Sequence, residues 1–318
     1  MRPAALLCAS LCLLVSCGLG GEVALEHDRG ERRLAVQVEG RTAIVYCYSP
    51  DHFLPYFWPV KSPSGKDLTV RLTKPYPHHR SFWFTDKVQL EGQRVTDFYN
   101  AYYRYKEGKG EHIRHQEFAQ MRTAGDRAFL TMELQWLLDL QTPVLDERRE
   151  VAFRALGDGE YLLDIRFTVA ASHGDVHWRS DAVHYAWPYV RMHPEFSVKQ
   201  GGTLVNSEGG KNQKGTHNKV ADWCDYSNTV DGTTEGLALF SHPENDRPHR
   251  WLTRDYGCFG PRRIDARSGK PFTLERGQSL ARRVGVLVHK GDVAGGRVAE
   301  RYRAYAEGDL ALLPPKGK

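Results

Sequence analysis

The chain has 318 residues, of which 41% are hydrophobic, 11% aromatic and 26% charged, a composition typical of a folded globular protein with a substantial core. Its formal net charge is only +5, and the lysines and arginines are scattered among acids, so no basic stripe predicts a nucleic-acid partner. Beyond the amino end, no apolar run is long enough to cross a bilayer, which excludes a helical membrane protein.

The first twenty residues have the pattern of an export signal. Arg2 supplies a positive start, and residues 4–15 form an apolar run too short to span a bilayer. The run ends in Leu14-Val15-Ser16-Cys17, which resembles the lipobox of bacterial lipoproteins, whose cysteine becomes the lipidated first residue. Ordinary cleavage near residues 18–21 is the alternative. We therefore predict a signal peptide over residues 1–20 and an exported chain, periplasmic or on the cell surface, whose membrane anchor would be a lipid on Cys17.

Three cysteines remain once this signal is removed, namely Cys47, Cys224 and Cys258. Their spacing fits no zinc knuckle. An odd number leaves either one disulfide bridge or a set of buried free thiols.

Short alternating segments follow the signal and predict an all-β chain. Strands are expected at residues 34–38, 43–48, 67–72, 113–121, 128–138, 150–156, 161–171, 182–190, 236–241, 251–259 and 280–289. Gly157-Asp158-Gly159 is typical of a hairpin turn, and the polar residues 201–218 indicate a long surface loop, a candidate lid. Helical spacing occurs in residues 293–306, where Val298, Tyr302 and Tyr305 share a face. We predict that residues 21–318 form a single domain, a large antiparallel β-sandwich of the supersandwich kind with one short C-terminal helix.

A polar loop over residues 74–84 is the first candidate for a site. Its sequence is Lys74-Pro75-Tyr76-Pro77-His78-His79-Arg80-Ser81-Phe82-Trp83-Phe84. The two X-Pro units hold the chain extended, and burial of the aromatic run anchors its far end. The loop is therefore predicted to form one wall of a polar pocket.

Two further polar clusters lie at the ends of predicted strands. One is Asp222-Trp223-Cys224-Asp225-Tyr226-Ser227, and the other is the His- and Arg-rich segment between Ser241 and Trp251. A β-sandwich presents loops to ligands at such positions. We predict that the three clusters meet around one pocket.

These motifs together resemble an exported bacterial family usually labelled PmoA-like. The resemblance is carried by Tyr56-Phe57-Trp58-Pro59-Val60, by the His-His-Arg block, by Asp222-Trp223-Cys224-Asp225-Tyr226-Ser227 and by His242-Pro243-Glu244-Asn245, and it covers nearly all of the mature chain. The label derives from the membrane subunit of methane monooxygenase, from which this chain departs because it has no transmembrane run, so methane oxygenase activity is not expected. Members of the family resemble proteins of bacterial sugar-degradation loci, which implies a carbohydrate ligand.

The residue types predict the same ligand class on physical grounds. Sugars are bound by planar groups that pair with hydroxyls and by an aromatic face beneath the ring. The candidate substrate-binding residues are Lys74, Trp83, Asp222, Trp223, His242, Asn245, Arg247 and Trp251. The alternative is that the tryptophans belong to the core and that the charges form ordinary ion pairs at loop bases.

The candidate catalytic residues are His78, His79, Arg80 and Asp225. A histidine titrating near neutrality beside Arg80 would be a general base, the arginine would stabilise an oxyanion, and Asp225 or Glu117 would be the acid or would orient the imidazole. Such groups suit a lyase, an epimerase or a hydrolase that acts on a sugar or keto-sugar, as a small molecule or within an oligosaccharide.

Other functions stay open at this point. A metal-dependent enzyme could use the histidines, but none of their spacings is a zinc signature, so no cofactor is predicted. A non-catalytic carbohydrate-binding lipoprotein would use the same pocket. A purely structural cell-surface module would leave the His-His-Arg block solvent-exposed and far from Asp225 and Arg247.

Overall fold

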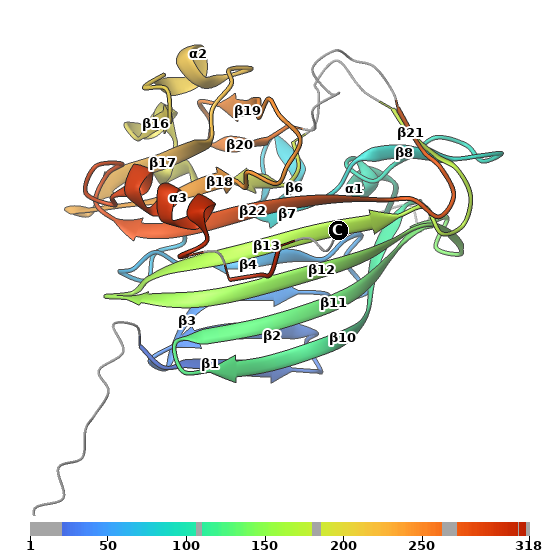
Figure 1. Cartoon of the computed structure of the whole chain (residues 1–318), viewed down its shortest axis with the longest axis horizontal. Helices are drawn as coiled ribbons and strands as arrows, with labels where there is room; N and C mark the ends of the chain where they lie inside the picture. Colours follow the sequence, from blue (N-terminus) through green and yellow to red (C-terminus); the bar gives the residue numbers. More distant parts are fainter. Residues whose placement is uncertain (1–20, 106–109, 180–185, 263–271, 311, 316–318) are drawn as a thin grey trace, which may run out of the picture.

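The structure is a computed structural model that describes residues 21–105, 110–179, 186–262, 272–310 and 312–315. The predicted signal peptide, including Cys17, and residues 182–185 of the strand predicted at 182–190 lie outside the described residues. Two large antiparallel sheets dominate the fold (Figure 1). The predicted all-β class and large antiparallel β-sandwich are confirmed.

Within the described residues each large sheet has eight strands. The first sheet has the order β1 (Val23–Asp28), β2 (Arg33–Val38), β3 (Arg41–Cys47), β4 (Tyr56–Val60), β7 (Phe82–Trp83), β15 (Tyr189–Arg191), β20 (Cys258–Pro261) and β19 (Trp251–Arg254). The second sheet has the order β10 (His112–Ala124), β11 (Arg127–Leu138), β12 (Thr142–Gly157), β13 (Glu160–Ala170), β22 (Ser279–Lys290), β18 (Thr233–Ser241), β17 (Trp223–Val230) and β16 (Thr203–Asn206).

Smaller elements cover the edges of these sheets. A third sheet has the order β21 (Phe272–Leu274), β14 (Val176–Trp178), β8 (Lys87–Leu90) and β9 (Thr96–Asp97), and a separate hairpin joins β5 (Arg71–Thr73) to β6 (Tyr76–Arg80). The helices are α1 (Ala101–Tyr105), α2 (Asn212–Thr216), α3 (Val298–Glu307) and two 3₁₀ turns, η1 (Pro194–Phe196) and η2 (Val198–Gln200).

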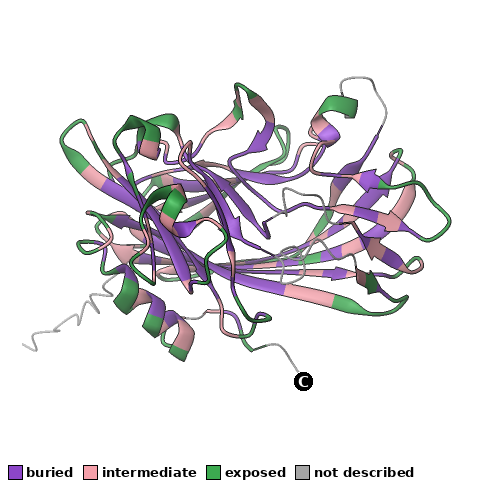
Figure 2. Cartoon of the chain, turned by 90° about the horizontal axis from the view of Figure 1, so that it is seen from above, coloured by how far each residue is buried: buried purple, intermediate pink, exposed green. Residues whose placement is uncertain are grey.

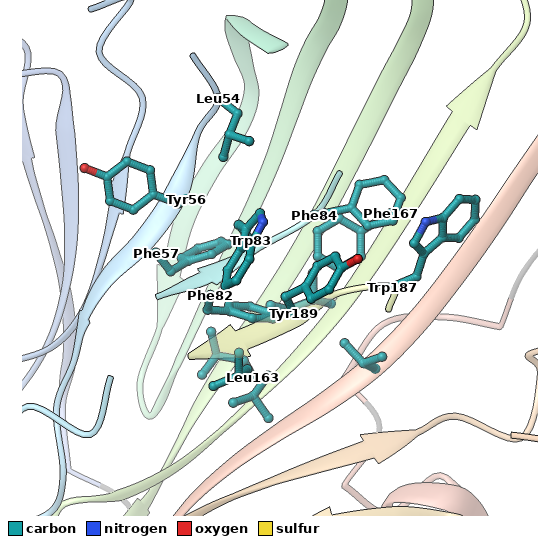
Figure 3. Close-up of a cluster of buried hydrophobic side chains, with 14 of the residues drawn as sticks. Leu54, Tyr56, Phe57, Phe82, Trp83, Phe84, Leu163, Phe167, Trp187 and Tyr189 are labelled. Atoms are coloured by element: carbon teal, nitrogen blue, oxygen red, sulfur yellow. The ribbon is translucent and has the colours of Figure 1, made fainter. Parts of the chain in front are cut away.

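An aromatic core holds the two large sheets together. The ring of Phe167 in β13 stacks on Phe84 at a centroid distance of 4.6 Å and meets the edge of Phe82 at 6.5 Å (Figure 3). Farther along, Tyr226 in β17 packs on Phe259 in β20 at 4.9 Å. Buried residues follow the strands, whereas exposed residues gather at the loops and on the helices (Figure 2). Each fully buried aromatic side chain contributes on the order of 2–3 kcal/mol through the area removed from water.

The long strands and the C-terminal helix follow the predictions closely. Strands β10, β11, β13, β18 and β22 lie at the expected residues, and Gly157-Asp158-Gly159 forms the turn between β12 and β13 with positive φ at all three residues. Helix α3 buries the predicted face of Val298, Tyr302 and Tyr305.

Three segments differ from the predictions. The loop predicted at residues 74–84 is a hairpin, since Tyr76 to Arg80 pair with β5 as β6. Residues 201–218, predicted as a surface loop, contribute β16 to the second sheet and contain α2. The strand predicted at residues 251–259 is broken into β19 and β20, because Gly257 turns the chain with a φ of 96° that few side chains tolerate.

Cys47, Cys224 and Cys258 are buried free thiols. Across the described residues, no helix is both long enough and apolar enough to span a bilayer.

Candidate functional site

His78 and His79, which we call the His-His block, lie on the face of the first sheet that points away from the second sheet. We call this face the outer face. Phe82 and Phe259 point into the core between the sheets. Neighbouring residues on a strand point to opposite faces, so Trp83 and its register partner Tyr189 point outward. Their rings stack at 4.9 Å (Figure 3). The ring of His79 lies 5.4 Å from that of Trp83.

The two histidines lie side by side on this face. Adjacent strand residues should point apart, but the rings of His78 and His79 are only 4.5 Å from each other. Two tyrosines hold them there, because the Tyr99 hydroxyl lies 3.1 Å from Nε2 of His79 and the Tyr103 hydroxyl lies 3.1 Å from Nδ1 of His78. The block is therefore a compact cluster of imidazoles and phenols.

Both imidazoles are neutral at pH 7. Burial, followed by the charge of Arg80, lowers the pKa of His78 to about 4. Burial, followed by His78 and Arg191, lowers the pKa of His79 to about 2. The predicted histidine titrating near neutrality is therefore not what this site contains, because desolvation outweighs every other influence.

Arg80 has a different setting from the one predicted. Its guanidinium lies over the rings of Phe53, at 4.5 Å, and Tyr102, at 5.3 Å, and reaches the carbonyl oxygen of Pro77 at 3.5 Å. The arginine that adjoins His79 is Arg191, which lies 4.6 Å from the ring of Tyr256 and is 4% exposed.

Aromatic rings frame the outer face. Tyr76 stacks on His79 at 4.9 Å and on Tyr256 at 5.0 Å. Tyr103 is 47% exposed, and its ring lies 5.6 Å from that of His78. Lys74 is exposed at the turn of the β5–β6 hairpin. Such rings could support the apolar face of a bound molecule.

Three buried nitrogen atoms in and around the His79 ring have no hydrogen-bond partner in the described part of the chain. They are Nδ1 of His79, Nε1 of Trp83 and Nε of Arg191. Leaving a buried polar group unpaired costs about 1–3 kcal/mol, so proteins retain such groups chiefly where they have a use.

The second predicted cluster lies elsewhere. Tyr226 points into the core, so Trp223 and Asp225 point to the opposite face of the second sheet. There Trp223 packs beneath α3, and Asp225 lies 2.7 Å from Nε2 of His289 with both side chains fully buried. Asp225 and His79 are thus separated by the core, and the predicted common pocket does not form around them.

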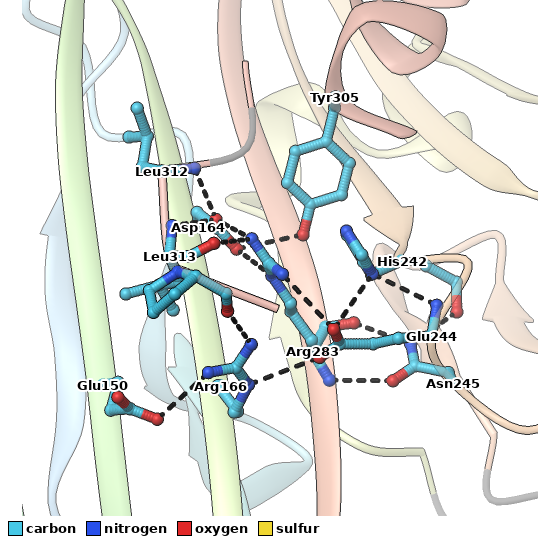
Figure 4. Close-up of polar contacts among 12 residues, drawn as sticks. Glu150, Asp164, Arg166, His242, Glu244, Asn245, Arg283, Tyr305, Leu312 and Leu313 are labelled. Carbon is cyan, nitrogen blue, oxygen red and sulfur yellow. Dashed lines mark hydrogen bonds and ion pairs between the residues drawn. The ribbon is translucent and has the colours of Figure 1, made fainter. Parts of the chain in front are cut away.

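The third cluster also lies by α3. Arg247 pairs with Asp222 at 3.5 Å, and His242 meets the ring of Tyr305 at 5.1 Å. The side chain of Asn245 bonds the backbone N–H and C=O of Arg283 at 2.8 and 2.6 Å (Figure 4). These contacts fit the alternative of ion pairs at loop bases.

The three tryptophans predicted to bind substrate do not lie together. Trp251 donates its indole N–H to the carbonyl of Ala221 at 2.8 Å and belongs to the core. Trp223 belongs to the cluster under α3. Of the predicted substrate-binding tryptophans, Trp83 is the one that lies beside the histidines.

Sequence reasoning missed Tyr99, Tyr189, Arg191 and Tyr256. A weak signal existed for Tyr256, which precedes the turn glycine Gly257. Nothing in the local pattern distinguishes the others from core residues, because pairing between distant strands brings them here.

The described residues contain no group of three or more His, Cys, Asp or Glu side chains placed to hold a metal ion. The described side chains around His79 carry imidazole, phenol, indole and guanidinium groups.

The chain resembles parts of several larger solved structures. The GH36 α-galactosidase AgaB from Geobacillus stearothermophilus is 9% identical, with a TM-score of 0.47 over 86% of this chain and 42% of that chain. A polysaccharide lyase, BACCELL_00875, is 11% identical, with a TM-score of 0.36 over 90% and 34%. A mutant of the heparan sulfate lyase HepC from Pedobacter heparinus is 10% identical, with a TM-score of 0.31 over 81% and 30%. The chain spans less than half the length of each, and at these scores the likeness assigns no function.

No curated protein matches the sequence. A family model does match, and it covers most of the chain from β2 to α3. Because residues 33–303 match the model described as "Family of unknown function (DUF6807)", the chain belongs to that family.

Proposed function

We propose that this protein is carbohydrate-active and binds a saccharide on the outer face, against His79, Trp83 and Arg191. The observation that carries the proposal is the set of three buried nitrogens that have no hydrogen-bond partner among the described residues and are framed by tyrosine rings. Sugar hydroxyl and carbonyl oxygens are acceptors for such donors, and the C–H face of a sugar ring packs on aromatic rings. The export predicted from residues 1–20 would bring the protein to saccharides outside the cytoplasm.

We further propose a lyase or epimerase reaction in preference to hydrolysis. The described groups that contact His79 are rings, and the nearest charge that acts on it is a guanidinium. Glycosidases in general need two carboxyl groups flanking the scissile bond, whereas the predicted Asp225 is on the other side of the core. Removal of a proton beside a sugar carbonyl instead needs hydrogen-bond donors at the carbonyl oxygen and a base that takes the proton. The neutral imidazole of His78, whose ring lies 4.5 Å from that of His79, would be that base.

His79 suits the role of such a donor. If the Tyr99 hydroxyl donates to Nε2, the imidazole carries its proton on Nδ1, the atom without a protein partner. A neutral imidazole can then donate to a carbonyl oxygen, and Arg191 beside it would stabilise the negative charge that develops there.

The test replaces His79 by Gln, and Tyr99 by Phe in a second variant. Each should weaken saccharide binding about tenfold, the effect of one lost hydrogen bond of about 1.4 kcal/mol, and should lower turnover at least as much. Calorimetry with a panel of sugars and keto-sugars measures binding, and mass spectrometry detects products. Tyr48→Phe is the matched control, because it removes a second Tyr–His contact, with His27, outside the site.

Binding without any product would identify a non-catalytic carbohydrate-binding protein. A His79→Gln variant that melts far lower yet binds as well as the parent would mark the residue as structural and contradict the proposal.

A further inference from the structure

Arginines gather where β19 and β20 continue the outer face. Arg191 and Arg254 are both register partners of Cys258, which lies between them on β20. Arg262 follows β20 on the same side, since Cys258, Gly260 and Arg262 alternate with the core residue Phe259. Three guanidiniums thus share the face that carries His79.

Two of these arginines converge on one histidine. Nη1 of Arg254 lies 2.9 and 3.0 Å from the two ring nitrogens of His217, and Nη2 of Arg262 lies 3.3 Å from Nε2. We call these three residues the arginine corner. A neutral imidazole offers one lone pair and a guanidinium has several N–H donors and no acceptor, so His217 cannot satisfy both arginines. Indeed Nε of Arg262, a side chain only 4% exposed, has no partner among the described residues.

The arginines of this face have no balancing carboxylate in the described part of the chain. Among the described residues, no carboxylate forms an ion pair with Arg191, Arg254 or Arg262. Burial and the charges of Arg254 and Arg250 lower the pKa of Arg262 to about 10. Burial raises the pKa of the nearby Cys258 thiol to about 12, so that group is neutral and offers no compensation. Grouped buried cations of this kind are strongly stabilised by an anion.

We propose that the arginine corner binds the oxyanion group of an acidic saccharide whose ring lies against His79 and Trp83. This inference rests on the proposed function and names its substrate class. Three adjacent antiparallel strands spaced by about 4.8 Å put the backbones of Arg191 and Arg254 about 10 Å apart, the span of a small saccharide. Guanidinium groups match carboxylate and sulfate oxygens in pairs, which gives such a sugar a defined orientation.

The experiment compares acidic sugars with their neutral counterparts on the full chain. Galacturonate and glucuronate probe a carboxylate, galactose 6-sulfate probes a sulfate, and galactose and glucose are the neutral references. Calorimetry at low and high salt should show tighter binding of at least one acidic probe, with an affinity that falls as salt rises. Inorganic sulfate alone tests whether the corner holds an anion without a sugar.

Arg262→Gln should lower the affinity for the preferred acidic probe about ten- to a hundredfold, the usual worth of a charge-assisted hydrogen bond, and should leave the neutral counterpart unchanged. Arg254→Gln, at a half-buried position, gives the same test if Arg262→Gln fails to fold. Arg122→Gln, which removes an exposed arginine on β10, is the charge-matched control and should change neither affinity.

The outcomes separate this inference from the proposed function. Equal affinity for acidic and neutral sugars in all variants would overturn the inference and leave the proposed function standing. Absence of binding by every saccharide would overturn both. Binding of inorganic sulfate that survives in Arg262→Gln and Arg254→Gln alike would also count against the corner.

Discussion

Buried arginines in this protein have two kinds of surroundings. Arg283 is enclosed by carboxylates, since Asp164 accepts two of its bonds at 2.8 and 2.6 Å and Glu244 lies at 3.3 Å (Figure 4). Arg191 and Arg262 are equally buried but have no described carboxylate partner. A buried arginine with a carboxylate partner fits a structural role, and one without such a partner among the described residues fits a ligand site, because a bound anion would supply the balancing charge.

Asp164→Asn tests the structural role. Asp164 is fully buried and also accepts bonds from the Tyr305 hydroxyl at 3.1 Å and from the N–H groups of Leu312 and Leu313 at 2.8 Å. Removing its charge leaves Arg283 buried without its main partner, so the free energy of unfolding should fall by about 3–5 kcal/mol in urea titrations.

The control for this variant is Glu133→Gln, which breaks the solvent-exposed pair with Arg148 and should cost less than about 1 kcal/mol. Equal effects of the two variants would mean that the buried network around Asp164 contributes no more than a surface pair.

At the scale of elements, helix α3 depends on two glycines that let it approach the second sheet. A Cβ at Gly296, just before the helix, would lie 2.1 Å from Nδ1 of His289, and one at Gly236 in β18 would lie 2.8 Å from Nε2. His289 cannot move away easily, because it is fully buried against Asp225. The buried Asp225–His289 pair therefore fits under the start of α3 only because both positions lack a side chain.

Gly296→Ala should consequently destabilise the fold. The added methyl group forces the helix start or His289 to shift, and such overpacking costs about 1–3 kcal/mol. Urea denaturation measures the loss. Gly30→Ala is the control, because its Cβ would meet only Asp28 at an ordinary 3.4 Å, and its effect should stay within about 0.5 kcal/mol. A Gly296→Ala variant as stable as the parent would show that α3 is loosely docked.

The elements that could be predicted are those with a strong local period. Helix α3 and most of strand β11 bury residues at their expected period within one segment. Strand β10 is mostly exposed and strand β13 is buried almost throughout, so these two were recognisable by their length rather than by burial of one face. The ends of the short strands could not be predicted for β5, β6, β16 and β19. Prolines, glycines and polar residues interrupt their hydrophobic pattern, and pairing with neighbouring strands determines where they begin and end.

At the scale of the whole molecule, the sequence could not predict which of the three polar clusters lie close together. Alternation correctly puts Asp225 on the face opposite to Tyr226, but no local pattern tells which of those faces adjoins His79. The order of strands decides this, since β7, β15 and β20 bring together Trp83, Tyr189 and Arg191 from distant parts of the chain. The His-His block was therefore predictable as a site candidate, and its partners were not.

The same burial predicts how the whole molecule responds to acid. The pKa of His78 falls to about 4 and that of His79 to about 2, against 6.5 for an ordinary histidine. Below pH 6.5 these histidines therefore take up protons in the unfolded chain but stay neutral in the folded chain. The stability that the neutral histidines contribute is complete above pH 6.5 and is lost as pH falls below it. His289 acts in the opposite direction, because Asp225 raises its pKa despite burial, and its contribution is lost as pH rises.

Urea denaturation between pH 7.5 and 5.5, where carboxylates are still mostly ionised, should show stability falling towards acid. His79→Gln should flatten this slope by up to about 1.4 kcal/mol per pH unit, the value of one proton taken up on unfolding. His289→Gln should steepen it, because Asp225 raises the pKa of this histidine and its effect on the slope is opposite to that of His78 and His79. A slope that His79→Gln leaves unchanged would mean that this imidazole titrates normally and is not sealed from water, which would also weaken its assignment as a neutral donor in the site.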